Sequence, residues 1–325
     1  MMQDKLSRLI PITIFLTFFL LGFQCKGQEE VVKPKRFYLE TAGGYGFPLV
    51  SDDLGSTNEL IGTVNRLIRA DSSISIKPVQ GTQGPGWHFL FNAGYMFHPN
   101  VGFEMGFRYL RSNRFLLARN STPTFQAEHG IIGERIDIIP HLVLNFNFNN
   151  KWSVYSKSGL VVPVWGRSRS DIKIDDQEGR LVADILDVEN PDVHGRVRIN
   201  ASTFGRFSYG FQTRVGAGYQ VLDWLTAFAE LSYMALTIRS KEDRFDEVEI
   251  SLFNVNTSGG TPFLLTEDGI DEIDKRTVFV DELTENSNNP EVNPNADPNR
   301  PLEELARKDN FNQLAISFGL RFFIK

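Results

Sequence analysis

The sequence predicts an all-β fold, a transmembrane up-and-down antiparallel β-barrel of eight strands, and three observations support this. Eight stretches alternate large apolar residues with small or polar ones, which is the period of a strand with two different faces. Short and long connections alternate between these stretches. Tryptophans stand where the stretches end.

The closing stretch, LAISFGLRFFIK, shows the alternation most clearly. Its large apolar side chains fall on one parity: Leu314, Ile316, Phe318, Leu320, Phe322 and Ile324. Its small or charged side chains fall on the other: Ala315, Ser317, Gly319 and Arg321. The eight stretches cover residues 36–49, 87–97, 101–109, 135–148, 152–165, 207–221, 224–236 and 314–325. Most run for roughly 9 to 14 residues, which is enough for a tilted strand to cross a bilayer.

The connections between the stretches are of two kinds. Three are tight turns, at residues 98–100, 149–151 and 222–223. Four are long, at about residues 50–86, 110–134, 166–206 and 239–312. Short turns on one side of the membrane and long loops on the other are typical of outer-membrane barrels. We therefore expect the long connections to be extracellular loops.

All four tryptophans stand at these connections. Trp152 and Trp224 follow tight turns, whereas Trp87 and Trp165 border long connections. These are the positions of a membrane-interface aromatic girdle. Trp152 and Trp165 differ in parity, so both rings can face lipid only if the strand contains a bulge; otherwise one ring points inward.

The first 27 residues are predicted to be a cleaved signal peptide, with the barrel domain spanning residues 28–325. Lys5 and Arg8 give a positive start, Leu9–Phe23 is apolar, and small residues precede Gln28. A membrane anchor helix is the weaker alternative, because the apolar run is short for a span. The one cysteine, Cys25, lies in this segment, so the mature chain is expected to lack disulfides and cysteine-bound metals.

The opening GGYGFPL, the closing FGLRFFIK and the alternating connections resemble small outer-membrane β-barrel proteins, similar to the OmpA transmembrane domain and the OmpW-like barrels. The resemblance implies an integral protein in the outer membrane of a Gram-negative bacterium, surrounded by outer-membrane lipid. It also implies a lumen laced with ion pairs, but no particular activity. The chain departs from the family pattern at its end, where Ile324 and Lys325 follow the expected final phenylalanine.

The inward-facing parity carries charges of both signs. The acids are Glu40, Glu104, Asp137 and Glu230, and the bases are Arg108, Arg135, Lys157, Arg214 and Arg321. An eight-stranded barrel has an interior about wide enough for its own side chains, and charges shielded from water must be paired. We therefore expect a charge network that fills the lumen. A gated ion path through the same network is the alternative.

The sequence contains no motif for catalysis or metal binding. Its five histidines form no His-x-His or HExxH pair, and no Gly-x-Ser-x-Gly stretch occurs. Ser168, Ser170 and His194 share the third long connection, but their spacing defines no catalytic triad. We expect no enzyme activity, no cofactor and no metal.

The last long connection is strongly acidic, because residues 241–309 carry 18 acidic and 7 basic side chains. Such a surface is suited to divalent cations, another surface ligand or a basic protein, and it repels nucleic acid. The alternative is a solvated, partly disordered loop, which the composition of Glu285–Pro301 favours. EVEISLFNV and RTVFVDEL are typical of strands, which would extend the barrel wall or raise the strand number to ten.

The first long connection contains STNELIGTVNRLIRA, in which Ser56 and Glu59 have capping-box spacing. A helical apolar stripe runs from Leu60 to Ile68. The pattern predicts a short amphipathic helix that packs against the other loops, with a position on the lipid surface or over the barrel mouth as the alternative.

These features predict a non-enzymatic outer-membrane protein with a structural or surface-interaction role exerted through its extracellular loops. A narrow porin-like channel or small-solute transporter is the second hypothesis. An outer-membrane lipid-modifying enzyme is the third.

Overall fold

The computed structural model describes residues 36–49, 52–53, 64–68, 74–78, 80–149, 151–179, 193–254 and 263–324. These residues belong to one unit, Lys35–Lys325, and the predicted signal peptide lies outside them. Within this described part of the chain, no helix has the length and apolarity needed to cross a membrane.

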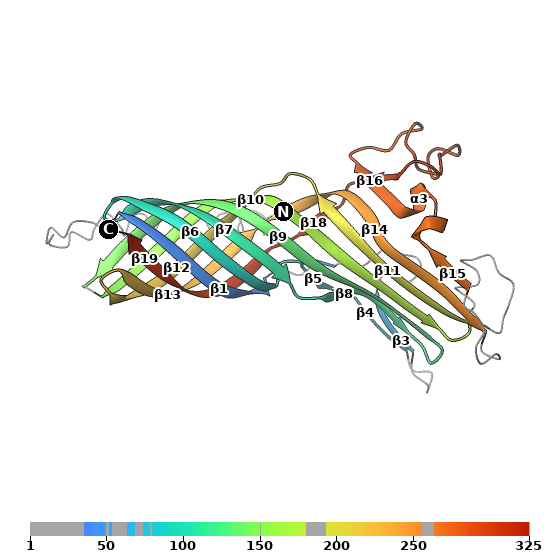
Figure 1. Ribbon diagram of the computed structural model, residues 1–325, viewed down its shortest axis with the longest axis horizontal. Coiled ribbons are helices and arrows are strands. Elements are labelled where there is room, and N and C mark those ends of the chain that lie inside the picture. Colours follow the sequence, from blue (N-terminus) through green and yellow to red (C-terminus); the bar gives the residue numbers. More distant parts are fainter. Residues whose placement is uncertain are drawn as a thin grey trace, which may run out of the picture. The chain divides into compact units, whose positions relative to one another are not determined.

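Eight long strands form a closed antiparallel ring (Figure 1). In chain order they are β1 (Phe37–Pro48), β6 (Gly86–His98), β7 (Val101–Ser112), β9 (Phe125–Phe148), β10 (Trp152–Asp176), β12 (Gly210–Leu222), β13 (Leu225–Ala235) and β19 (Gln313–Ile324). Each strand pairs with the next in this order, and β19 pairs with β1 to complete the ring. The predicted eight-stranded antiparallel barrel is therefore confirmed.

The ring has an apolar exterior and a polar interior. On β6, Phe89, Phe91 and Tyr95 are 55%, 45% and 43% exposed, whereas His88 and Asn92, on the opposite parity, are buried. A soluble protein distributes its residues in the opposite way. Apolar side chains outside and polar side chains inside are the pattern of a barrel surrounded by lipid.

Strands β9 and β10 continue beyond the ring and carry a second sheet, which we name the extension (Figure 1). It consists of β8 (Phe115–Ser121), residues 125–134 of β9, residues 166–176 of β10, β11 (Val193–Gly205) and β14 (Thr237–Asn254), paired in that order. One face buries branched side chains such as Ile172, Val197 and Val248, a composition that favours strands. Two of the connections that we expected to be loops, 110–134 and 166–206, are thus mainly strand where the structure describes them.

Short elements complete the described chain. They are β2 (Asp52–Asp53), β3 (Val64–Ile68), β4 (Ile74–Pro78), β5 (Gln80–Gly81), β15 (Phe263–Thr266), η1 (Glu267–Gly269), α3 (Glu272–Lys275), β16 (Arg276–Val280), β17 (Leu302–Leu305) and β18 (Lys308–Asn310). Most of EVEISLFNV belongs to β14, and RTVFV forms β16, which pairs with β14 and β17. Both therefore extend the wall outside the ring, and the ten-stranded alternative is wrong.

The amphipathic helix expected in the first long connection is not formed where the structure describes that segment. Val64–Ile68 is strand β3, which pairs antiparallel with β4. The partner strand alternates Ile74 and Ile76 with polar residues, a β-branched pattern that favours sheet pairing. Ser56 and Glu59 lie outside the described residues.

Strand β10 changes partner halfway along its length. Its residues Trp152–Val161 pair with β12, whereas Arg167–Asp176 pair with β11. The register with β9 shifts at a bulge between Pro163 and Trp165. Proline has no N–H to donate to a ladder, so an interruption at this residue is expected.

Candidate functional site

The nine charged side chains predicted to face inward all lie buried within the ring. Glu40 is the centre of the larger group. Its carboxylate lies 2.5 Å from Lys157 Nζ and 2.5 Å from Arg321 Nε, and Asn92 Nδ2 donates to it at 3.0 Å. Lys157 Nζ also lies 2.8 Å from Glu104. Two acids from different strands therefore share one lysine.

Two tyrosines pack beside these charges. Tyr38 donates its hydroxyl hydrogen to Glu104 at 3.0 Å. A Cβ atom at Gly94 would lie 2.1 Å from the Tyr38 ring, and one at Gly216 would lie 2.4 Å from the Tyr155 ring. Only glycine fits at these two positions unless the tyrosines move.

Glu230 and Arg214 form another buried pair. Arg214 Nη1 donates to Glu230 at 3.3 Å, and Arg214 Nη2 donates to Gln212 Oε1 at 2.9 Å. Tyr155 donates its hydroxyl hydrogen to the second oxygen of Glu230 at 3.2 Å. The carboxylate is therefore held by one charged and one neutral donor.

The second group of charges surrounds Asp137 of β9. Its carboxylate lies 2.6 Å from Arg108 Nη2 and 2.7 Å from Arg135 Nε. The Arg135 guanidinium also lies 4.7 Å from the centre of the Phe311 ring, a cation–π contact. Two arginines thus share one carboxylate.

These contacts pack the interior of the ring. Arg108, Arg135, Arg214 and Lys157 are among the largest side chains with less than 2% of their surface exposed. Charged side chains that line a water-filled pore would be exposed to its water, and these are not.

Residues 82–84 pack into the ring near the start of the extension, a feature that the sequence analysis missed. Thr82 Oγ1 donates to the Asn310 carbonyl at 2.7 Å, and Ser168 Oγ donates to Gln83 Oε1. A Cβ atom at Gly84 would lie 2.7 Å from the carbonyl oxygen of Phe311. The only sequence signal is the glycine-rich GTQGPG, which is also typical of an ordinary turn.

All four tryptophans face outward from the ring. Trp87, Trp152, Trp165 and Trp224 are 68%, 51%, 44% and 48% exposed. The bulge between Pro163 and Trp165 resolves the parity conflict, because Val164 and Trp165 are both exposed although they are consecutive. The rings therefore lie on the apolar exterior, near both kinds of connection.

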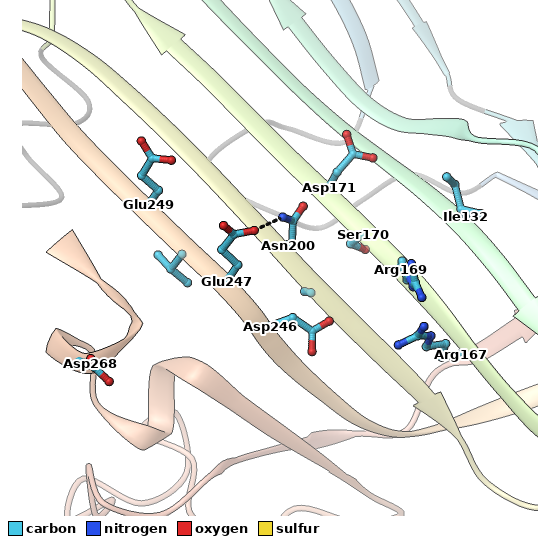
Figure 2. A pocket seen from close by; sticks show the side chains of 12 residues that line it. Ile132, Arg167, Arg169, Ser170, Asp171, Asn200, Asp246, Glu247, Glu249 and Asp268 are labelled. Atoms are coloured by element: carbon cyan, nitrogen blue, oxygen red, sulfur yellow. Dashed lines mark hydrogen bonds between the residues drawn. The ribbon is translucent and has the colours of Figure 1, made fainter. Parts of the chain in front are cut away.

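A groove of about 1080 Å³ lies on the extension, mainly on the face opposite its buried aliphatic side chains (Figure 2). Its two sides differ in charge. Arg167 and Arg169 of β10 line one side, and Asp246, Glu247, Glu249 and Asp268 line the other. Among the described residues, Glu249 and Asp268 pair with no basic side chain. The groove is therefore suited to ion pairing with a charged ligand.

Three acids elsewhere in residues 241–309 form ion pairs with arginines. The pairs are Glu242 with Arg276 at 2.8 Å, Asp243 with Arg307 at 2.5 Å, and Asp281 with Arg206 at 2.9 Å. These three carboxylates are thus paired within the protein, and Arg206 is the partner that comes from outside the segment.

The segment Glu285–Pro301 is a series of turns arranged around Asn288, which is only 2% exposed. Its Nδ2 donates to the carbonyl oxygens of Asp297, Arg300 and Pro301 at 3.1, 3.0 and 2.9 Å. Its Oδ1 accepts the Asp297 N–H at 2.7 Å. The sequence composition favoured a solvated loop for this segment. The structure instead shows turns whose backbone is hydrogen-bonded to the buried Asn288 amide.

Two titratable groups on the extension have shifted pKa values. Burial lowers the pKa of His129 to about 4, and its Nε2 lies 3.1 Å from Ser170 Oγ. Burial raises the pKa of Asp171, but the hydrogen bonds and charge of Arg114 lower it more, so the net pKa lies below its usual value. Arg114 Nε and Nη2 donate to the two Asp171 oxygens at 2.9 and 2.7 Å.

The residues considered for catalysis do not come together. Ser168 contacts Gln83, whereas Ser170 contacts His129. His194 Nε2 instead lies 2.9 Å from Asp175. No group of three or more His, Cys, Asp or Glu side chains in the described ranges is arranged to hold a metal ion.

No family model and no curated protein matches the chain. Among solved structures, the chain is similar to Neisserial surface protein A, with 10% identity over 89% of this chain and 97% of that one and a TM-score of 0.33. It is also similar to OmpT, an outer membrane protein of Vibrio cholerae, with 8% identity over 91% and 100% of the two chains and a TM-score of 0.09. The fold class, an eight-stranded β-barrel with an apolar exterior, rests on the closed ring itself.

Proposed function

We propose that this chain is an integral outer-membrane β-barrel that acts by binding at its surface. The ring serves as a packed anchor in the bilayer, and the extension holds the binding site. One observation carries the proposal: the charges of the ring are buried in pairs, whereas the extension presents a charged groove of about 1080 Å³. The apolar exterior of the ring supports the membrane location, and the predicted signal peptide supports export.

The ligand class that fits the acidic side of the groove is a basic segment of another protein. Glu247, Glu249 and Asp268 would attract it through complementary charge, which also speeds association. Binding, rather than catalysis, is the proposed role because the lining side chains are acids and arginines suited to ion pairs. Divalent cations and other surface ligands are the alternatives.

A fluorescent oligolysine peptide tests this site on the protein refolded in lipid nanodiscs. The variant Glu247→Gln/Glu249→Gln should bind the peptide about tenfold more weakly, because two carboxylates of the groove are lost. The control Glu285→Gln/Glu291→Gln removes the same charge from the turn segment and should bind as the wild type does. An equal loss in both variants would mean that only net charge matters, and no loss in either would refute the groove.

A narrow channel is the second candidate, and one observation favours it. Arg135 Nη1 and Arg321 Nη2 are buried within the ring and make no hydrogen bond among the described residues. Buried polar atoms of this kind are commonly satisfied by water, and a hydrated lumen is the first requirement of an ion path. Conductance measurement separates this candidate from the packed anchor.

A further inference from the structure

On β7, β9 and β10 the apolar exterior of the ring ends at one cross-strand row. In the register of β6, β7, β9 and β10, this row is Trp87, Arg111, Glu134 and Arg167. The neighbouring row on the ring side is apolar throughout: Phe89, Tyr109, Ile136 and Trp165. Adjacent rows are about 7 Å apart, so on β7, β9 and β10 the exterior changes from apolar to charged within one step. A boundary of this kind between apolar and charged side chains is where acyl chains give way to headgroups on a membrane protein.

Three arginines, two in this row and one in the next row away from the ring, share a single carboxylate. Arg111, Arg167 and Arg169 lie 3.9, 3.5 and 3.4 Å from the oxygens of Glu134. A strong charge-assisted hydrogen bond is about 2.7–2.9 Å long, so none of these pairs is tight. In the described part of the chain, no other carboxylate pairs with the three arginines, and Arg167 Nε makes no hydrogen bond. Their donors are therefore open to a ligand.

The neighbouring Arg114 shows the contrast. Both ends of its guanidinium are used by Asp171, at 2.9 and 2.7 Å. That arginine has its partner within the protein, whereas the three around Glu134 must divide one carboxylate, which is itself only 9% exposed.

We propose that Arg111, Arg167 and Arg169 bind the phosphate monoester of a lipid headgroup in the outer leaflet. Three arginines and one glutamate leave a charge of +2, which matches the −1.5 to −2 of a phosphate monoester near neutral pH. The guanidinium fork also fits phosphate oxygens in a bidentate manner. The side chains of Arg111 and Arg169 are 59% and 49% exposed, so a headgroup can reach them.

The surroundings favour a lipid over soluble phosphate. The Arg167 guanidinium lies 5.7 Å from the centre of the Trp165 ring, so the charged and apolar surfaces are continuous. Phe207 and Tyr209, 80% and 73% exposed, lie in the segment between β11 and β12, opposite the stretch of β10 that pairs with neither strand. Acyl chains would pack on these aromatic rings while the phosphate contacts the arginines.

The test is a lipid titration of the refolded protein in detergent micelles, with bound lipid counted by native mass spectrometry. Phosphatidic acid carries a phosphate monoester, phosphatidylglycerol a diester, and phosphatidylcholine no net charge. The wild type should bind phosphatidic acid about tenfold more tightly than phosphatidylcholine, with phosphatidylglycerol between them. In Arg111→Gln/Arg167→Gln/Arg169→Gln this preference should fall to within about twofold.

The matched control is Lys173→Gln/Arg196→Gln/Arg198→Gln, which removes three charges from β10 and β11 further from the ring and should keep the preference. An unchanged preference in the arginine variant, or an equal loss in both triple variants, would overturn the proposal. So would displacement of phosphatidic acid by an equal concentration of inorganic phosphate, because the site would then take the free ion. If the triple variant does not fold, the single Arg169→Gln replaces it and should lower the preference severalfold.

The inference rests on the proposed membrane location, and the two can fail separately. Flotation of the wild type with lipid vesicles tests the location alone. If the protein floats with the vesicles but does not distinguish the three lipids, only the phosphate site is refuted. If the protein does not float with the vesicles, the proposed membrane location is refuted.

Discussion

Lys157 joins two buried carboxylates of the ring. Its ammonium lies 2.5 Å from Glu40 and 2.8 Å from Glu104. Two buried carboxylates so close to each other are tolerated only while a cation stays between them, because unpaired charge in a water-poor interior is costly. Among the described residues, Arg321 forms an ion pair with Glu40 but not with Glu104.

Replacing Lys157 with alanine should therefore destabilise the protein strongly. We expect the free energy of unfolding to fall by about 3 to 5 kcal/mol, the usual cost of breaking a buried ion pair. Urea unfolding of the protein refolded in lipid vesicles measures this. Lys151→Ala, in an exposed turn, should change it by less than about 0.5 kcal/mol. A loss at Lys157 no larger than that of the control would mean that water already solvates the lumen charges.

Which face each of these residues takes could be predicted from parity, because a strand sends successive side chains to opposite sides. Lys157, Arg214 and Glu230 are all buried as that rule requires. Parity could not predict which charged residues pair with each other, because Glu40 and Lys157 are brought together only when the ring closes. The trio around Glu134 was missed for a related reason: Arg111, Arg167 and Arg169 lay in segments that we expected to be loops.

Among the elements, the extension departs most from expectation. Strands β9 and β10 have 24 and 25 residues, about twice what the ring requires. Their outer halves alternate too, but with charged residues where the ring has apolar ones, so the apolar stripe that marks a membrane strand is lost. The bulge at Pro163 then reverses which residue parity faces outward along β10. The structure shows this reversal because the consecutive residues Val164 and Trp165 are both exposed.

His129 makes the stability of the extension depend on pH. Its folded pKa of about 4 lies below the value of about 6.5 for an unfolded chain, and burial is the main cause; Asp171, Arg307 and Arg114 also act on it. Between these values the unfolded chain binds more protons than the folded one, so stability falls as pH falls from about 6.5 to 4.

Limited proteolysis of the extension in urea at several pH values measures this effect. His129→Gln should lower the pH slope by up to about 1.4 kcal/mol per unit in that window, since one fewer proton is taken up on unfolding. The variant and the wild type should converge in slope above pH 7. Identical slopes below pH 6.5 would show that His129 is solvated enough to titrate normally in the folded protein.

At the scale of the whole molecule, the proposed function assigns anchoring to the ring and binding to the extension. The ring turns its apolar side chains outward and pairs its charges within, whereas the extension turns charges outward and buries aliphatic residues. One pair of strands, β9 and β10, belongs to both, so the arginine side of the groove is built on strands that continue from the ring. The proposed lipid contact lies where the apolar exterior of the ring meets the charged exterior of the extension.

Ion conductance of the refolded protein in a planar lipid bilayer tests most directly whether the ring is a packed anchor. The intact protein should stay silent, because Lys157, Arg108 and Arg214 are buried within the lumen. A variant without residues 285–301 should also stay silent, since that segment forms turns outside the ring strands. Steady unit steps from the intact, folded protein would contradict the packed lumen and make the channel the better explanation.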